Sequence, residues 1–348
     1  MAHCTLLSIK YDVIFMRIFF ESRPFYPSVG GMETVARQLA EAWAQRGHDV
    51  QIVTQTPLGS AVEVEACEIH RRPSINTWLR QLSDADVFVQ SGISLKTLPL
   101  GWVMRTPTVV IHHNMLPLTG STVGIRNGLK RLAARFAENI AVSEAVANDL
   151  ARDQTTVIHN PFEPGFSESG QDVDSHRLLF VGRLVSVKGV DIALRALAEL
   201  DERYILDICG EGPERDDLEE LAHRLEIADR VTFHGWVDHK DLAPLAQATA
   251  IQLIPSRYES FGIVALEGIA AGCAIVAANT GGLPEAVGPC GVLVSSDDPS
   301  EFAEAINQAV TYRDQFLSHR EEHLQHFHID TIADQYLDVF EKTVREST

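Results

Sequence analysis

The chain has 348 residues, which is enough for about two domains of ordinary size, each with its own core. Hydrophobic residues make up 45% and charged residues 22%, which is typical of a folded globular protein and excludes an intrinsically disordered one. The net charge of −19 is concentrated after residue 160, where 14 Lys and Arg face 34 Asp and Glu, and so acidic a chain is a poor candidate for binding nucleic acid.

The first fifteen residues differ in pattern from the rest of the chain. Met16 opens an apolar strand that runs directly into the first motif, whereas Lys10 and Asp12 interrupt the apolar residues before it. This pattern is not that of a signal peptide. We therefore expect residues 1–15 to be a loose or non-native extension.

Neither a membrane span nor a disulfide framework is predicted. The uncharged run Gly268–Pro284 contains four glycines and is too polar to cross a bilayer. The five cysteines are scattered and form no C-x-x-C pair. We expect reduced thiols and a cytoplasmic protein.

From Arg17 onward, short apolar strands alternate with helices, which is typical of a parallel sheet covered on both faces. The strands predicted in the first half are Ile18–Phe20, Val50–Thr54, Val87–Gln90, Val109–His113, Asn139–Val142 and Thr156–His159. The stretch Gly31–Arg46 has the apolar spacing of a helix. Residues 16–160 are therefore predicted to be one Rossmann-like domain.

The rhythm breaks at residues 161–177, where two prolines, two glycines and several acidic residues predict a linker. It restarts with predicted strands at Leu178–Val181, Tyr204–Cys209, Val231–His234, Ile251–Ile254, Ala274–Ala278 and Val292–Val294. The second Rossmann-like domain then covers 178–325, and a C-terminal helix over 326–348 could pack back on the first domain. The expected class is α/β, with two doubly wound domains facing across a cleft that receives the ligand.

The segment Pro27-Ser-Val-Gly-Gly-Met-Glu33 joins the first strand to a long helix. Gly30 and Gly31 would let backbone N–H groups approach an anion at the helix N-terminus, where the partial charge is positive. A tight turn needs glycine as well, so a purely structural role stays equally open.

A second glycine-bearing loop comes after the strand Leu178–Val181. After Gly182 it carries Arg183 and Lys188, cations placed where a strand ends. An Arg can bind phosphate oxygens with two parallel hydrogen bonds, and a Lys acts as a point charge. The alternative is a pair of ordinary surface cations.

The third constellation is Glu259-Ser-Phe-Gly-Ile-Val-Ala-Leu-Glu267. Glu259 lies in a loop after a strand, and the turn through Phe261, Gly262 and Ile263 offers N–H groups to an anion. Glu267 lies inside an otherwise apolar helix, where a buried carboxylate costs several kcal/mol unless it is hydrogen-bonded. Ribose hydroxyls would supply such bonds, and so would a buried structural ion pair.

Together these motifs resemble the retaining glycosyltransferases of family 4, which have the GT-B fold. The matching segments are Gly30-Gly31, His113, Val142-Ser143-Glu144, Asn160, Gly182-Arg183-Leu184, Lys188-Gly189, Gly210-Glu-Gly-Pro213, Phe233-His-Gly235, Glu259 with Glu267, and Thr280-Gly-Gly-Leu-Pro-Glu285. They extend from Arg17 to about Tyr336 and are more specific in the second half. The family usually has Asn-Gly-Val-Asp where this chain has Asn160-Pro-Phe-Glu163.

The resemblance assigns roles to these residues. It implies that Arg183 and Lys188 hold the donor pyrophosphate, together with Gly31. Glu267 would hold the ribose, Glu259 the sugar hydroxyls, and the backbone of Phe261–Ile263 the sugar and phosphate. His113 would contact the sugar near the scissile bond, while His112 would point to the opposite face of its strand. The implied catalytic set is Arg183, Lys188, Glu259 and His113, and the donor-binding set is Gly30, Gly31, Gly182, Phe261, Gly262, Ile263 and Glu267.

The implied reaction is hexose transfer, with retention, from a UDP- or GDP-sugar to a saccharide, lipid-linked or small-molecule acceptor. Such a reaction would serve the assembly of cell-surface polysaccharide or glycolipid, with no cofactor or metal. The alternatives are a non-catalytic nucleotide-sugar-binding protein or partner subunit, and an epimerase or phosphorylase of the same fold. The intact set of Arg183, Lys188, Glu259 and Glu267 favours the transferase.

Two features resemble metal sites. Asp84-Ala-Asp86 lies before a strand and Asp172-Val-Asp174 lies in the predicted linker, so neither is expected to hold an ion. Four histidines near the end of the chain are expected to be solvated surface residues: His319, His323, His326 and His328.

A basic stretch in the first half is the last candidate. The cations Arg126, Lys130, Arg131 and Arg135 alternate with the apolar residues Ile125, Leu129, Leu132 and Phe136. We expect the cations to share one broad helix face and part of the apolar set to turn towards the core. Two interpretations stay open: a solvated helix face, or a patch that docks on an anionic membrane or a lipid-linked acceptor.

Overall fold

The computed structural model describes residues 14–347 except 27–29, 58–63, 65–66, 119–121, 153, 163 and 167–172. The expectation for residues 1–15 therefore lies outside the described residues, apart from Ile14 and Phe15. Both of these are exposed, whereas Met16 is fully buried.

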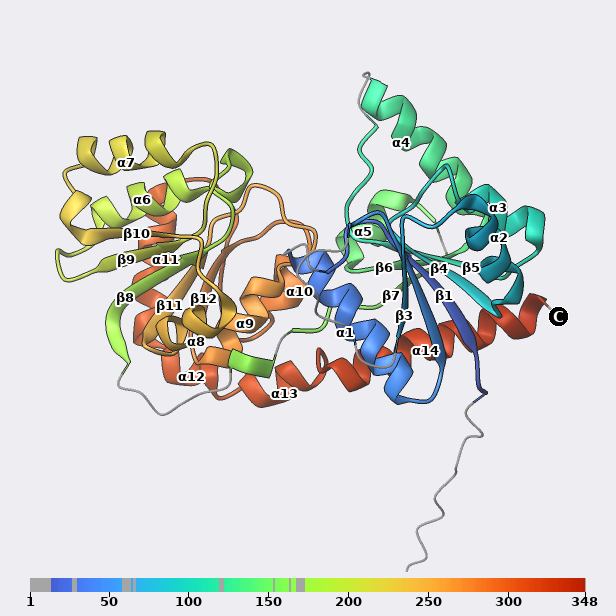
Figure 1. The fold of residues 1–348 in the computed structure, drawn as a ribbon. Helices are drawn as coiled ribbons and strands as arrows, with labels where there is room; N and C mark the ends of the chain where they lie inside the picture. Colours follow the sequence, from blue (N-terminus) through green and yellow to red (C-terminus); the bar gives the residue numbers. More distant parts are fainter. Residues whose placement is uncertain are drawn as a thin grey trace, which may run out of the picture. The chain divides into compact units, whose positions relative to one another are not determined.

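Two parallel sheets with alternating helices make up the fold (Figure 1). The first sheet has the strand order β3-β2-β1-β4-β5-β6-β7. Its strands are β1 Arg17–Ser22, β2 Asp49–Thr54, β3 Glu68–Arg71, β4 Val87–Ser91, β5 Thr108–His112, β6 Glu138–Ala141 and β7 Thr155–Val157. Its helices are α1 Gly31–Gln45, α2 Ile75–Asp84, α3 Leu98–Met104, α4 Thr122–Ala133 and α5 Glu144–Leu150.

The second sheet repeats the same topology in the order β10-β9-β8-β11-β12-β13. Its strands are β8 Asp174–Val181, β9 Ile205–Cys209, β10 Val231–Gly235, β11 Thr249–Ile254, β12 Ala274–Ala278 and β13 Gly291–Val294. Helices α6 Val190–Glu199, α7 Arg215–Arg224, α8 His239–Gln247, α9 Ile263–Ala271 and α10 Leu283–Val287 connect them. The chain ends with α11 Pro299–Thr311, α12 Arg313–Leu317, α13 Arg320–Gln325 and α14 Ile329–Ser347.

The chain divides into two compact units. The first unit comprises the described residues up to Ile111, the segment Leu129–Glu138 and the end of the chain from Ala333. The second unit comprises His112–Gly128 and Asn139–Ile332.

Aromatic side chains join α14 to the core of the first unit. Trp43 of α1 is fully buried and meets the ring of Phe20 edge-on, with 5.4 Å between ring centroids. Tyr336 and Phe340 of α14 meet the same indole at 5.8 Å and 5.1 Å. Arg46 adds an ion pair with Asp334, with 2.6 Å between Nε and Oδ1. The last helix is therefore part of this hydrophobic core.

The α/β class is confirmed, and two local predictions need correction. The edge strand β3 was not predicted, because its sequence Glu-Ile-His-Arg has no apolar run. β8 begins at Asp174, inside the predicted linker, because its first residues are polar and exposed and carry no apolar signal.

Candidate active site

The strand order of the second sheet reverses between β8 and β11. In doubly wound sheets ligands bind beyond the carboxyl ends of the two strands at such a switch point. The loop after β8 carries Arg183 and Lys188, and the loop after β11 carries Glu259. Topology alone therefore brings these two predicted motifs to the same edge of the sheet.

Close packing holds the loop after β8 in place. Lys188 ends a short 3₁₀ helix, Ser186–Lys188, and Gly189 comes next with a φ of 69°, in the left-handed region. A Cβ at Gly189 would lie 1.9 Å from the carbonyl oxygen of Pro255, so that only glycine fits. Arg183 stands exposed near the start of the loop, beyond Gly182. The turn therefore brings two cations to the end of β8 within six residues of each other.

Lys188 and Glu259 form an ion pair, with 2.5 Å between Nζ and Oε2. The two side chains are 27% and 15% exposed, so the pair is half-buried and still reachable from solvent. An incoming anion could therefore compete with Glu259 for the ammonium group. The structure thus joins two predicted catalytic residues that are far apart in sequence.

Arg257 fixes these two loops to each other, and the sequence analysis did not single it out. Its guanidinium binds the carboxylate of Asp191 with two hydrogen bonds of 2.9 Å and 2.8 Å. It also donates to the carbonyl oxygen of Ser186 at 2.6 Å. Burial alone would lower the pKa of Arg257, but its hydrogen bond to Asp191 raises that pKa. Its place just after a strand, in the loop that carries Glu259, was the signal that could have found it.

A third loop supports the backbone of Glu259. A Cβ at Gly281 would lie 1.7 Å from the carbonyl oxygen of Glu259, and Gly282 N–H donates to that same oxygen at 3.2 Å. Gly281 also has a φ of 54°, in the left-handed region. The paired glycines after β12 are therefore needed for the position of Glu259.

The helix α9 begins at Ile263, after Gly262, whose φ of 99° turns the chain into the helix. Phe261 is buried and stacks on His159, so only its backbone can contact a ligand. Glu267 is half-exposed, and the expectation that it is buried is wrong. It lies one turn after Ile263, on the strip of α9 that its neighbours leave uncovered.

His113 comes directly after β5 and is only 8% exposed. Burial, followed by the charge of His112, lowers the pKa of His113 to about 4, so the imidazole is neutral at neutral pH. His112 pairs with Asn139 at 2.9 Å between Nε2 and Oδ1, which gives it a structural partner.

The residues after His113 contact the loop of Glu259 within the second unit. Met115 N–H donates to Tyr258 Oη at 3.0 Å, and Ser260 Oγ lies 3.2 Å from Asn114 Oδ1. These contacts place the segment that begins with His113 beside the residues on both sides of Glu259.

Two further predicted motifs meet in the second unit. Ser143 caps α5 and also donates from Oγ to the carbonyl oxygen of Ser260 at 2.7 Å. The carboxylate of Glu285 accepts from Glu144 N–H at 3.0 Å and pairs with His159 Nε2 at 2.8 Å. The Ser143-Glu144 motif thus contacts both the loop that carries Glu259, through Ser260, and the segment Thr280–Glu285, through Glu285.

Gly30 and Gly31 lie in the first unit, at the start of α1, and Pro27–Val29 lie outside the described residues. Gly30 has a φ of 174°, an extended conformation that any residue adopts. A Cβ there would meet only the flexible side chain of Glu33. A tight turn therefore does not explain Gly30, which weakens the structural interpretation of this motif.

The first sheet has a polar network at its own switch point that the sequence analysis missed. Glu21 of β1 is buried and accepts from Gln90 Nε2 at 2.7 Å and from Thr97 Oγ1 at 2.6 Å. Another missed residue is Trp236, which lies just after β10 and is 60% exposed. An exposed aromatic ring at the carboxyl end of a strand can stack on a nucleobase.

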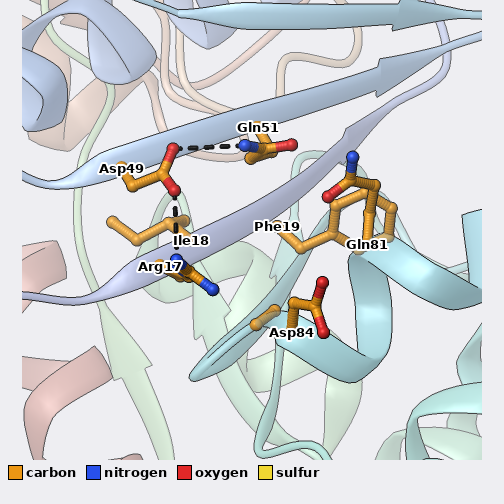
Figure 2. A pocket seen from close by; sticks show the side chains of 8 residues that line it. Arg17, Ile18, Phe19, Asp49, Gln51, Gln81 and Asp84 are labelled. Carbon is orange, nitrogen blue, oxygen red and sulfur yellow. Dashed lines mark hydrogen bonds and ion pairs between the residues drawn. The ribbon is translucent and has the colours of Figure 1, made fainter.

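Asp84 and Asp86 lie at the opposite edge of the first sheet. Asp86 accepts from Arg17 N–H at 2.7 Å. Figure 2 shows Asp84 beside a hollow at the start of β1 and β2, where Asp49 pairs with Arg17 and Gln51. Asp172 lies outside the described residues. Among the residues that the structure describes, no group of three or more His, Cys, Asp or Glu side chains could hold a metal ion.

The histidines near the end of the chain differ from one another. His319, His326 and His328 are exposed, as expected. His323 is not a solvated residue: its Nε2 lies 2.8 Å from the carbonyl oxygen of Ala286, and its ring packs on Phe327. Burial lowers the pKa of His323.

Comparison with known proteins identifies the family. Residues 29–166 match the model "Glycosyltransferase Family 4", and residues 163–322 match "Glycosyl transferases group 1". The chain belongs to the group 1, family 4 glycosyltransferases. An uncharacterized glycosyltransferase of Methanocaldococcus jannaschii is 33% identical to this glycosyltransferase, over 90% of this chain and 94% of that one. The D-inositol 3-phosphate glycosyltransferase of Mycobacterium tuberculosis is 37% identical, over 60% of this chain and 51% of its own length.

Solved structures confirm the GT-B fold of this glycosyltransferase. Anabaena HepE in complex with UDP superposes with a TM-score of 0.80 at 22% identity, covering 94% of this chain and all of that one. WaaG, a glycosyltransferase involved in lipopolysaccharide biosynthesis, gives 0.71 at 19% identity, over 93% and 99% of the two chains. No helix in the described part of the chain is both long and apolar enough to cross a membrane.

Proposed function

We propose that this glycosyltransferase transfers a hexose, with retention, from a UDP-sugar to a saccharide or lipid-linked acceptor. The observation that carries the proposal is the half-buried ion pair of Lys188 with Glu259 at the switch point of the second sheet, with the exposed Arg183 in the same loop as Lys188. Between the two donors considered, UDP- and GDP-sugars, the HepE structures with UDP and with UDP-glucose favour the first.

The chemistry arises from the charges at this edge. Breaking the bond between the sugar and the diphosphate leaves negative charge on the phosphate, and Arg183 and Lys188 would neutralise it. In this proposal Lys188 leaves Glu259 when the diphosphate binds, which frees the carboxylate to accept hydrogen bonds from the sugar hydroxyls. The N-terminus of α9 adds partial positive charge.

Retention requires the new bond to form on the face that the diphosphate leaves. We assign no carboxylate nucleophile to this step. The acceptor oxygen bonds to the anomeric carbon as the bond to the diphosphate breaks, and a phosphate oxygen takes the acceptor proton. Neutral His113 would donate or accept a hydrogen bond near this carbon, because its lowered pKa leaves it uncharged at neutral pH.

The alternatives fit these observations less well. The intact set of both cations, the carboxylate and the supporting glycines favours a transferase over a binding protein whose donor motifs have decayed, and a same-fold epimerase has no independent support. We place the reaction in the cytoplasm, because the free cysteines Cys209, Cys273 and Cys290 are buried thiols that suit a reducing compartment. Cell-surface glycan or glycolipid assembly is the role we propose.

A donor panel tests the proposal. The protein is incubated with UDP-, GDP- and ADP-sugars, and nucleotide release is measured with and without candidate acceptors. We expect release from a UDP-sugar, stimulated by an acceptor, and a product with the anomeric configuration of the donor by NMR. Release from none of the donors, or an inverted product, would contradict the proposal.

A further inference from the structure

A stripe of large apolar side chains runs along the outer side of α4 and of the short 3₁₀ helix Ala134–Phe136 that follows it. Ile125, Leu129, Leu132 and Phe136 are 68%, 52%, 52% and 62% exposed. Their spacing of four, three and four residues puts them on one face of the helix. The expectation that part of this set turns towards the core is wrong, because Gly124, Asn127 and Ala134 occupy the buried side.

The expectation that the four cations share one face is wrong: Arg126 of α4 and Arg135 of the turn after it lie on either side of the stripe. Arg126 and Arg135 are exposed, whereas Lys130 and Arg131 are half-buried. The 25 residues from His113 to Ala137 contain no Asp or Glu, although the whole chain has 48. This helix is therefore a basic region of a strongly acidic protein.

Contacts hold the stripe in this exposed position. The ring of Phe136 lies 4.8 Å from that of Trp102, centroid to centroid, and Trp102 Nε1 donates to the carbonyl oxygen of Phe136 at 3.0 Å. Asn127 on the inner side donates to the carbonyl oxygen of Pro117 at 3.0 Å. Val103 of α3 is also exposed, beside Trp102.

We propose that this stripe docks on the surface of an anionic lipid bilayer. An amphipathic helix with apolar residues between basic ones inserts its apolar face into the headgroup region, while its cations bind anionic lipids. A second copy of the chain fits less well, because paired stripes would bring Arg126 and Arg135 of two helices together. Docking here would present the enzyme to a lipid-linked acceptor. It does not depend on which nucleotide sugar is the donor.

Flotation with vesicles tests this proposal. The full-length protein is mixed with vesicles of phosphatidylcholine alone or of phosphatidylcholine with phosphatidylglycerol, at low and at physiological salt. We expect binding to the anionic vesicles that weakens with salt and is much weaker on the neutral ones. The double variant Leu129→Ser/Leu132→Ser should lower the bound-to-free ratio about tenfold or more, because two leucines no longer insert.

Matched variants separate the stripe from a general effect on the helix. Val123 is exposed on the same helix but off the stripe, so Val123→Ser should bind as the wild type does. Arg126→Gln/Arg135→Gln should remove most of the salt dependence. Circular dichroism establishes that each variant is folded.

Three results would overturn the proposal. They are the absence of binding to anionic vesicles at low salt, equal binding of the stripe variant and the wild type, and stripe-dependent dimers in sedimentation velocity without vesicle binding. Nucleotide release measured without vesicles should be the same for the stripe variant and the wild type. A failure of docking is thereby distinguishable from a failure of the proposed transfer.

Discussion

The two sheets share one strand order but carry different chemistry at their switch points. In the first sheet, Glu21 is buried and takes hydrogen bonds from Gln90 and Thr97, and it also pairs with Arg23 at 3.5 Å between Nε and Oε1. In the second, Lys188 and Glu259 form a half-buried charged pair, and the loop of Lys188 also carries the exposed Arg183. A satisfied buried network favours rigidity, whereas an accessible ion pair can exchange one partner for a ligand. One topology can thus give a structural centre in one sheet and a candidate catalytic centre in the other.

The glycines show the same difference. In the second sheet, Gly189 and Gly281 lie so close to backbone carbonyl groups that a Cβ could not fit. In the first unit, Gly30 is extended and meets only a flexible side chain. Close packing therefore requires glycine at Gly189 and Gly281. At Gly30 packing does not require it, and its role would be to let a ligand approach the backbone.

The largest effect should come from removing the cations of the second switch point. Lys188→Ala and Arg183→Ala should each lower kcat by about 10²-fold, because both side chains would act on charge that develops in the transition state. Steady-state kinetics with the working donor measures this. The exposed Lys240→Ala serves as the matched control. Near-normal turnover of both variants would rule out this edge as the donor site.

The pH dependence of stability should report the burial of His113. Its folded-state pKa of about 4 lies below its ordinary value of 6.5, so the unfolded state takes up the proton first as the pH falls. The stabilisation is complete above pH 6.5 and is lost between 6.5 and about 4, by about 3 kcal/mol from this residue.

Urea unfolding of the wild type and of His113→Asn between pH 7 and pH 4 tests this value. The variant should lose less stability over that range than the wild type does. His48 and His323, whose pKa values burial also lowers, remain in both proteins and contribute equally. Identical pH profiles would show that His113 is not buried in its neutral form.

Replacing Gly189 and Gly30 by alanine, one at a time, compares how much each glycine contributes to the stability of the fold. Gly189→Ala should cost about 2 kcal/mol or more in the free energy of unfolding, because it combines a left-handed φ with an overlap on the Pro255 carbonyl. Gly30→Ala should leave stability within about 0.5 kcal/mol of the wild type, since Glu33 can move aside. Chemical denaturation measures both. A large loss for Gly30→Ala would restore the structural interpretation of that motif.

A smaller effect is expected at Glu267. Glu267→Ala should weaken donor binding about tenfold, because a lost hydrogen bond to a charged group costs about 1.5 kcal/mol or more. Isothermal titration with UDP measures the change, and Glu199→Ala, on α6, is a carboxylate control. Unchanged affinity for UDP would remove Glu267 from the ribose site.

The motifs that sequence reasoning found share a local signature. The segments Gly182–Gly189 and Glu259–Ile263 each combine glycine with charge or a helix start immediately after an apolar strand, so that strand order alone brings them together. The Glu21 network could not be predicted, because its members are up to 76 positions apart and none lies in such a motif. The exposure of the α4 stripe was missed for another reason. Periodicity shows that a helix has an apolar face but does not show whether anything covers that face.

Chelation should have the smallest effect of all. The proposed site neutralises the diphosphate with Arg183, Lys188 and the N-terminus of α9, which together can carry the charge that a divalent ion carries in other transferases. The carboxylate pair that most resembles a metal site is Asp84 with Asp86. Asp86 already accepts a hydrogen bond from the backbone N–H of Arg17, at the edge of the first sheet opposite its switch point. Activity should therefore stay within about twofold of its starting value in excess EDTA.

The measurement is the initial rate of nucleotide release before and after chelation, with Mg²⁺ and Mn²⁺ added back. Loss of activity that either ion restores would show that the cations of the second sheet are not sufficient. In that case Asp84→Asn and Asp86→Asn would be the first variants to make.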